Sequence, residues 1–329
     1  QRGRPLCVRP GVRPEPAALD RAARGRARVR LKRSPREAHM TLVSRARTYG
    51  SLVAVAHTLF ALPFAASAVV LSLAVPHRRL DGWRVALMLA CMVCARTSAM
   101  AFNRWADRDI DAQNMRTRSR HIPAGLVRPG EALGLAVASG LGFLGAAAAL
   151  GFWPGVLAPS VLAILLGYSY AKRFTWGAHA WLGVALALAP GGAWIAMGAR
   201  PGPGIVALMI AVMTWLLGFD VLYSLQDEEF DRAAGLRSIP SRFGGRRSLA
   251  MSASAHGVTV LALAFCGWVL GRGPAYAVAV ATAAALLVYE HSLVRRRGLA
   301  VIDKAFFDVN AWVSVLFFAL VSCDELLRR

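Results

Sequence analysis

Nine long apolar runs follow one another along the chain, and they constrain its fold more than any other feature of the sequence. They cover residues 52–75, 83–102, 131–151, 155–170, 180–198, 204–222, 248–270, 274–293 and 305–323. A helix needs about 20 mostly apolar residues to cross the hydrocarbon core of a bilayer. Hydrophobic residues make up 56% of the 329 residues, and the 17% that are charged are grouped between the runs. The sequence therefore predicts an all-α integral membrane protein with about nine transmembrane helices.

The excess of basic residues predicts how these helices are oriented. The chain carries 39 Lys and Arg against 18 Asp and Glu, a net charge of +21 that on a soluble surface would indicate nucleic-acid binding. Here the loops after the second, fourth, sixth and eighth runs hold most of the arginines, and the alternate loops hold only Arg78, Arg79, Arg200 and Arg272. By the positive-inside rule, the basic loops and the amino terminus face the cytoplasm. We therefore expect a multi-pass protein of the cell inner (cytoplasmic) membrane, whose partner is the lipid bilayer and not a nucleic acid.

The first 40 residues differ in composition from the rest of the chain. Twelve of them are Arg or Lys, and residues 1–39 contain too few large apolar side chains to form a core. We expect a disordered basic tail over 1–40 and one transmembrane domain over 41–329. The sequence begins at Gln1, so Met40 is a candidate natural start, in which case the tail is not part of the natural protein; a basic anchoring tail is the alternative.

Two acidic motifs follow two of the apolar runs with the same internal spacing. Asn103, Asp107 and Asp111 recur every four residues just beyond the second run, so a continuing helix would place them on one face. The same spacing recurs 120 residues later, at Tyr223, Asp227 and Asp231. The repeat predicts that two pseudo-repeated halves of one fold face a common metal site at one end of the helices.

The residue types in and around these motifs favour a hard cation and an anionic substrate. Mg²⁺ typically binds through one or two carboxylates together with phosphate oxygens, and carboxylates close together repel one another unless a cation lies between them. Either motif alone is equally compatible with a solvated, salt-bridged loop, but the repeat favours the metal. Lys172, Arg116 and Arg120 are candidate ligands of a diphosphate.

Two charged residues lie deeper in the apolar runs. Arg96 precedes Asn103 by seven residues, which places it about two helical turns below the first motif. It is a candidate partner of a substrate carboxylate, although a partner on another helix is the alternative. Asp220 precedes Asp227 by the same seven residues and could pair with Arg96 or with a backbone donor; its role stays open.

These residues resemble the UbiA-type superfamily of intramembrane prenyltransferases. The first family motif, N-x-x-x-D-x-x-x-D, is matched by Asn103, Asp107 and Asp111, and the second, D-x-x-x-D, by Asp227 and Asp231. The family element Y-x-x-x-K is matched by Tyr168 and Lys172, and the resemblance runs from about Arg47 to the carboxyl terminus. The segments K-R-F-T-W and D-E-E-F-D-R-A-A-G-L-R-S-I-P look most similar to 4-hydroxybenzoate polyprenyltransferases and to menaquinone-pathway relatives. The chain departs from many relatives in having H-I-P after Arg120, where they have R-P-L-P, so His121 would be a weaker replacement for a second clamp arginine.

The resemblance implies nine transmembrane helices around a central cavity and a set of roles for the motif residues. Asp107, Asp111, Asp227 and Asp231 would be catalytic and would bind Mg²⁺. The diphosphate would be bound by Asn103, Tyr168, Lys172, Arg116 and Arg120, and the acceptor by Arg96.

The implied reaction is the Mg²⁺-dependent transfer of a polyprenyl group from polyprenyl diphosphate to an aromatic acid. The first acceptor to consider is 4-hydroxybenzoate, in ubiquinone biosynthesis, and the alternative is a dihydroxynaphthoate, in menaquinone biosynthesis. A hypothesis of another class is an ion-coupled membrane transporter. Transporters place such acids near the midplane of the bilayer, whereas both motifs here lie at the ends of apolar runs.

Overall fold

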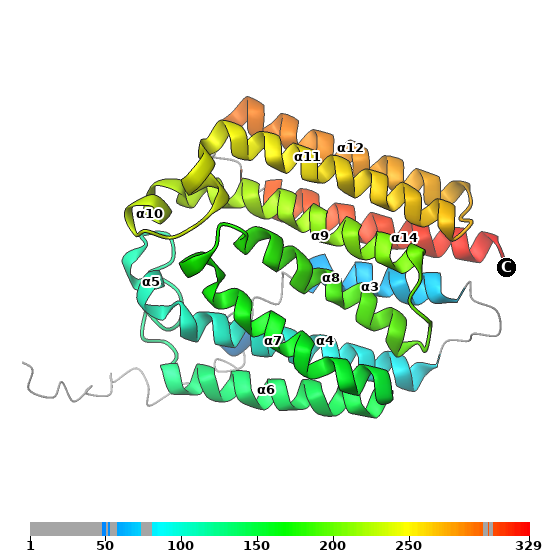
Figure 1. Ribbon diagram of the computed structural model, residues 1–329, viewed down its shortest axis with the longest axis horizontal. Helices are drawn as coiled ribbons and strands as arrows, with labels where there is room; N and C mark the ends of the chain where they lie inside the picture. The colour runs from blue at the N-terminus through cyan, green and yellow to red at the C-terminus, as the bar shows by residue number, and fades with distance from the viewer. Residues whose placement is uncertain (1–47, 51, 53–57, 74–80, 299–301, 303–304) are drawn as a thin grey trace, which may run out of the picture. The chain divides into compact units, whose positions relative to one another are not determined.

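The computed structural model describes residues 48–50, 52, 58–73, 81–298, 302 and 305–329, all of which belong to one compact unit, Arg47–Arg329. The proposed tail over 1–40 lies outside the described residues. Every regular element among the described residues is a helix (Figure 1). The long helices are α3 (Thr58–Ser72), α4 (Gly82–Ala106), α6 (Pro129–Leu150), α7 (Phe152–Phe174), α8 (Ala178–Ala196), α9 (Pro203–Ser224), α11 (Ile239–Val269), α12 (Pro274–Arg297) and α14 (Asn310–Leu327). The short elements are α5 (Arg108–Gln113), η3 (Leu225–Asp227), α10 (Glu228–Ala233) and the π-helical turn η5 (Ala305–Val309).

The long helices correspond one to one with the nine predicted apolar runs. Eight of them are long and apolar enough to cross a membrane, and α3 is a shorter apolar helix of 15 residues. Local signals fix several helix starts: α6, α9 and α12 each begin at a proline, which lacks the N–H that the first turn leaves unbonded. The Asp81 side chain caps α4 by accepting a hydrogen bond from Trp83 N at 3.0 Å. The predicted all-α membrane fold is confirmed, and the protein is a multi-pass integral membrane protein.

The order of helices repeats along the described chain. The series α3, α4, α5, α6, α7 is followed by α8, α9, α10, α11, α12, and the helices of each corresponding pair begin 110 to 122 residues apart. The packing repeats as well, because α4 packs on α6 as α9 packs on α11. The last helix, α14, packs on α3 and α12. The predicted pseudo-repeat is therefore present in the fold.

An aromatic cluster holds the two halves together deep in the helical unit. Phe64 of α3 lies 5.0 Å from Trp215 of α9, between ring centroids, and 5.3 Å from Phe317 of α14. Trp215 is completely buried and contacts Phe219, one turn on, at 4.9 Å. Such aromatic pairs contribute roughly 0.5–1.5 kcal/mol each beyond the area that they bury.

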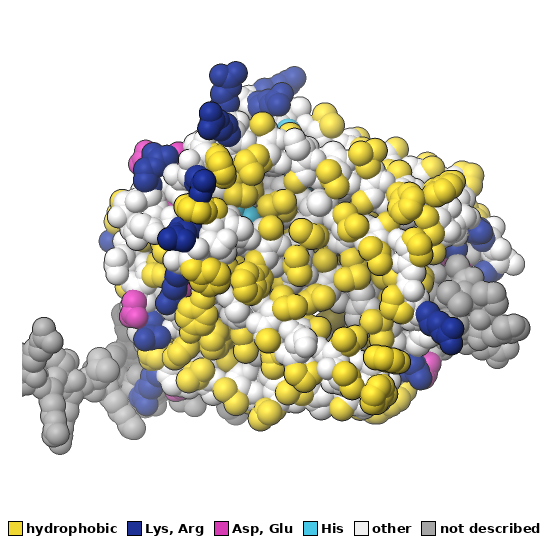
Figure 2. Space-filling view, viewed as in Figure 1, with side chains coloured by type: hydrophobic (Ala, Val, Ile, Leu, Met, Phe, Trp, Pro, Cys, Tyr) yellow, Lys and Arg dark blue, Asp and Glu magenta, His cyan; other side chains and the backbone are white. Residues whose placement is uncertain are grey.

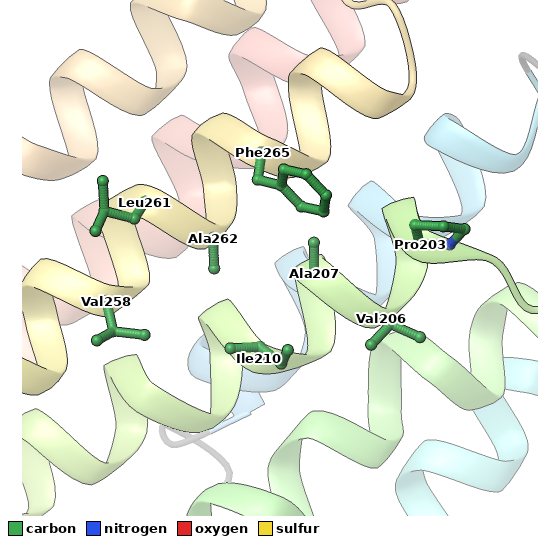
Figure 3. A pocket seen from close by; sticks show the side chains of 8 residues that line it. All are labelled: Pro203, Val206, Ala207, Ile210, Val258, Leu261, Ala262 and Phe265. Carbon is green, nitrogen blue, oxygen red and sulfur yellow. The ribbon is translucent and has the colours of Figure 1, made fainter.

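The surface of the helical unit separates apolar and basic regions. Figure 2 shows hydrophobic side chains across the middle of the unit and Lys and Arg gathered mainly at the end where Figure 1 places α5 and α10. A groove of about 370 Å³ lies between α9 and α11 on the apolar surface (Figure 3). Its lining is Pro203, Val206, Ala207, Ile210, Val258, Leu261, Ala262 and Phe265. These side chains offer no hydrogen-bond donor to an anion. A binding site for an anionic substrate is therefore expected at the basic end of the unit and not in this groove.

Candidate functional site

The first acidic motif lies where α4 ends and α5 begins. Asp107 separates the two helices, yet the helical hydrogen-bond pattern continues through it, because Asp107 N donates to Asn103 O at 2.9 Å and Asp111 N to Asp107 O at 2.8 Å. The Asn103 amide also donates to Asp107 Oδ2 at 2.9 Å and lies 3.5 Å from Ser169 Oγ of α7. The motif residues therefore occupy successive turns beside α7, as the spacing predicts.

The second motif is built in the same way. The helix α9 ends at Ser224, the single turn η3 carries Asp227, and α10 carries Asp231. Both carboxylates are buried, with 7% and 2% of the residue surface exposed. Burying a carboxylate in this way is costly unless it is paired or bound to a metal.

The loop after the first motif reaches across to the second motif. Arg116 donates to both oxygens of Asp227, at 3.0 Å from Nε and 2.5 Å from the terminal nitrogen, and its other terminal nitrogen donates to Tyr223 Oη at 3.1 Å. The Asn114 amide donates to Asp227 at 3.2 Å. A bidentate arginine fixes both distance and orientation. Segments more than 100 residues apart in sequence therefore meet at one site.

Each of the four motif carboxylates is paired with a different basic side chain. The nitrogen-to-oxygen distances are 2.5 Å for Arg116–Asp227, 2.7 Å for Arg120–Asp111, 3.8 Å for Lys172–Asp231 and 3.3 Å for Arg173–Asp107. Three of these cations are the candidate diphosphate ligands named from sequence, and the structure brings all of them to the acidic motifs. Four carboxylates near one another repel, and four opposite charges offset that repulsion.

The carboxyl end of α7 supplies two of these cations. Lys172 and Arg173 occupy its last turn, where the helix dipole favours positive charge. Arg173 also donates to Ala106 O at 2.6 Å, and the loop after α10 is bound to the same turn, since Arg237 N donates to Lys172 O at 2.7 Å. Tyr168 lies one turn earlier on the same helix. The end of α7 therefore joins both motifs.

The donor set fits Mg²⁺ that binds together with an anionic ligand. Asp111 Oδ2 and Asp231 Oδ2, one from each motif, are buried oxygens without a hydrogen-bond partner. The described part of the chain holds no ready-made group of three or more His, Cys, Asp and Glu placed to enclose a metal ion. Mg²⁺ does not need such a group, because phosphate oxygens and water commonly complete its coordination.

Two pKa shifts describe the electrostatics around the site. Burial raises the pKa of Asp107 above its usual value, and the hydrogen bond from Arg173 acts against this rise. Burial, and then the positive charge of Arg104, lower the pKa of His121. This shift favours the neutral form of the His121 imidazole.

The two deeper charges are not paired with each other. Arg96 lies half-buried in α4. Asp220 is paired with His179 of α8 at 2.6 Å, so its partner is neither of the two considered from sequence. His179 and Asn114 were missed by the sequence analysis. Asn114 follows Asp111 by three residues, so its spacing could have indicated a place in the site. The sequence around His179, in contrast, does not predict that it pairs with Asp220.

Comparisons with known proteins agree with this geometry. The family model described as the UbiA prenyltransferase family matches residues 61–320. The 4-hydroxybenzoate octaprenyltransferase of Aromatoleum aromaticum is 34% identical over 237 residues, which are 70% of this chain and 78% of that protein. The apo structure of a UbiA homolog from Aeropyrum pernix K1 has a TM-score of 0.74 and 32% identity, over 82% of this chain and 98% of that one.

A second solved structure supports the fold alone. The UbiA homolog from Archaeoglobus fulgidus bound to GPP and Mg²⁺ has a TM-score of 0.63 at 20% identity, over 84% of this chain and 99% of that one. The matched family region covers both acidic motifs and nearly all of the long helices. The chain therefore belongs to the UbiA prenyltransferase family.

Proposed function

We propose that the protein transfers a polyprenyl group from polyprenyl diphosphate to 4-hydroxybenzoate in a reaction that needs Mg²⁺. The observation that carries the proposal is the pairing of the four motif aspartates with four different cations, with one buried carboxylate oxygen in each motif that accepts no hydrogen bond. The identity of 34% to a 4-hydroxybenzoate octaprenyltransferase supports this acceptor. By the distribution of basic loops, the acidic end faces the cytoplasm.

The aspartates and the basic side chains have complementary roles in the proposal. The four motif aspartates, with Asn103, would hold Mg²⁺, which when bound supplies positive charge to the diphosphate oxygens and makes diphosphate a better leaving group. Lys172, Arg116 and Arg120 exchange their aspartate partners for diphosphate oxygens when the substrate binds. They then balance the negative charge that grows on diphosphate as the allylic C–O bond breaks. The Tyr168 hydroxyl contributes a further contact to the diphosphate.

The acceptor binds below the diphosphate, between the apolar helices. Arg96 lies about two turns deeper than Asn103, and its guanidinium binds the acceptor carboxylate. This places the phenol ring toward the allylic carbon, and the ring carbon next to the hydroxyl-bearing carbon forms the new bond. Apolar side chains around the site exclude water, which would otherwise capture the carbocation.

Membranes that contain the protein provide the direct test. With a radiolabelled polyprenyl diphosphate, Mg²⁺ and 4-hydroxybenzoate, we expect a lipid-soluble aromatic product that disappears when EDTA removes the metal. A dihydroxynaphthoate in place of 4-hydroxybenzoate distinguishes the two acceptors. Absence of product with every aromatic acid tested would overturn the proposal and favour a transporter.

A pair of variants in α10 tests the proposed metal ligands. Asp231→Asn removes the charge of a buried carboxylate, and Glu229→Gln removes the same charge from an exposed neighbour two residues away. We expect Asp231→Asn to abolish transfer at all Mg²⁺ concentrations and Glu229→Gln to match the wild type. Equal activity of both variants would refute the metal role of Asp231.

A further inference from the structure

One buried pair of titratable side chains is not used by the chemistry described so far. His179 of α8 and Asp220 of α9 lie 2.6 Å apart, between Nδ1 and Oδ2. The His179 side chain is 1% exposed, whereas the Asp220 side chain is 16% exposed. The imidazole is therefore enclosed behind the carboxylate, and the carboxylate keeps part of its surface open.

The hydrogen bonds of His179 determine where its proton lies. Its second nitrogen, Nε2, accepts the backbone N–H of Ile239 at 3.3 Å, so this nitrogen carries no hydrogen. The proton of the neutral imidazole is then on Nδ1 and is donated to Asp220. His179 is thus a fixed donor to one oxygen of Asp220, and this is the one side-chain hydrogen bond that Asp220 makes among the described residues. The other oxygen is left to accept a hydrogen from elsewhere.

Asp220 lies at the depth that the acceptor would occupy. It precedes Asp227 by seven residues on α9, which is about 10 Å along a helix axis. With the 120-residue spacing of the two motifs it matches position 100 of the corresponding helix α4, four residues closer to the first motif than Arg96. The carboxylate therefore lies below the acidic motifs and about one helical turn above Arg96, the residue proposed to bind the acceptor carboxylate.

We propose that Asp220 is the base that takes the proton released by the acceptor ring, and that His179 is the positioning residue that orients it. The proposal rests on the proposed function. Once the ring carbon has bonded to the prenyl group, its C–H bond breaks, the electron pair returns to the ring and restores aromaticity, and the proton passes to Asp220 Oδ1. The resulting carboxylic acid loses this proton to water when the product leaves.

The alternative role for this pair is structural, as a link between α8 and α9. Asp220→Asn separates the two roles, because the amide oxygen still accepts from His179 while the basic oxygen is lost. We expect transfer to 4-hydroxybenzoate to fall about 100-fold, in line with the loss of a general base. Binding of the prenyl diphosphate with Mg²⁺, measured by calorimetry on the detergent-purified protein, should stay within about twofold of the wild type.

An isotope effect gives a second readout that a structural role would not change. With 4-hydroxybenzoate deuterated on the ring, Asp220→Asn should show a primary isotope effect on kcat that the wild type lacks, because proton removal becomes rate-limiting. Unchanged transfer by Asp220→Asn would overturn the proposal, and so would a loss that extends equally to donor binding. A wild type that prenylates no aromatic acid would instead overturn the proposed function.

Two substitutions of His179 test the positioning role. Gln can donate to Asp220 and accept from Ile239 N–H, so His179→Gln should keep most of the activity. His179→Leu removes both hydrogen bonds and should lower kcat without raising the KM for the prenyl diphosphate. Equal losses in the two variants would show that His179 does not act through these hydrogen bonds.

Discussion

At the scale of single residues, the site depends on which cation faces which aspartate. Arg116 binds Asp227 through two nitrogens and also lies over the ring of Tyr223, at 5.3 Å from the guanidinium carbon to the ring centroid. Such a planar fork matches a carboxylate or a phosphate, whereas a lysine offers one compact charge. The same side chain is therefore suited both to hold Asp227 and to bind a diphosphate.

The Arg116→Lys variant tests this geometry. We expect the KM for the prenyl diphosphate to rise about tenfold, because one charge-assisted hydrogen bond is worth roughly 1.5–3 kcal/mol and the fork is lost. Arg118→Lys, at an exposed position in the same loop, is the control and should not differ from the wild type. Steady-state kinetics in detergent micelles would show the difference, and an unchanged KM for Arg116→Lys would argue against its role.

At the scale of helices, close approach depends on small residues and on internally satisfied polar groups. Gly218 of α9 lies against His256 of α11, where an added Cβ would stand 2.2 Å from the imidazole ring. His256 in turn donates a hydrogen bond from Nε2 to Trp215 O at 3.2 Å, and its Nδ1 lies 3.0 Å from His291 Nε2, with which it shares a second hydrogen bond. In membranes, where the hydrophobic effect does not drive association, such tight packing and hydrogen bonding hold helices together.

Gly218→Ala should therefore destabilise the protein by roughly 1–3 kcal/mol through overpacking. The control is Gly257→Ala in α11, where an added Cβ has no neighbouring atom within 4 Å. We expect it to be neutral or slightly stabilising, since alanine favours the helix. Thermal unfolding in detergent measures both variants, and equal midpoints would contradict the close packing.

A buried series of hydrogen bonds joins α9, α12 and α14 and leads to a second prediction at the scale of helices. Trp215 Nε1 donates to Asn310 Oδ1 at 2.8 Å, and Asn310 Nδ2 donates to Glu290 Oε1 at 2.7 Å. Asn310→Leu leaves Trp215 and Glu290 buried without their hydrogen bonds to Asn310. We expect the free energy of unfolding to fall by about 1–3 kcal/mol for each of the two buried groups. Glu290→Gln keeps an acceptor for Asn310 and should retain near wild-type stability. If chemical denaturation ranks the two variants in the opposite order, this account of the hydrogen-bond series is wrong.

At the scale of the whole helical unit, the arrangement of the helices brings both acidic motifs to the same end. The helices α4 and α9, which carry them, begin 121 residues apart and occupy matching places in the repeat. On the face drawn in Figure 2, Lys and Arg side chains gather mainly at this end, with apolar side chains over the middle. The candidate site therefore lies at one end of the helices and not in the apolar middle of the unit.

Membrane orientation is a prediction at the same scale. In a cysteine-free background, Ser119→Cys marks the loop between α5 and α6, and Arg200→Cys marks the loop between α8 and α9. A membrane-impermeant thiol reagent should label Arg200→Cys in right-side-out vesicles and Ser119→Cys in inverted vesicles. The reverse pattern would place the acidic end outside the cytoplasm and contradict the positive-inside assignment.

The sequence alone determined the helices, the repeat and the composition of the motifs. Run length and hydropathy are local properties, so the apolar runs predict helices such as α6 and α12 to within a few residues. The spacing of Asp107 and Asp111, repeated in Asp227 and Asp231, likewise predicts which faces carry the acids. Lys172, Arg116 and Arg120 were identified as a group by type and by position relative to the apolar runs.

Only the tertiary structure decided how these residues pair. Arg116 contacts Asp227 across 111 positions, and His179 contacts Asp220 across 41. Such contacts depend on the rotation and crossing of packed helices, which no local pattern encodes. Asp220 shows the difference: its depth in α9 follows from counting residues, but its neutral, oriented partner became visible only once α8 and the backbone of Ile239 were placed beside it.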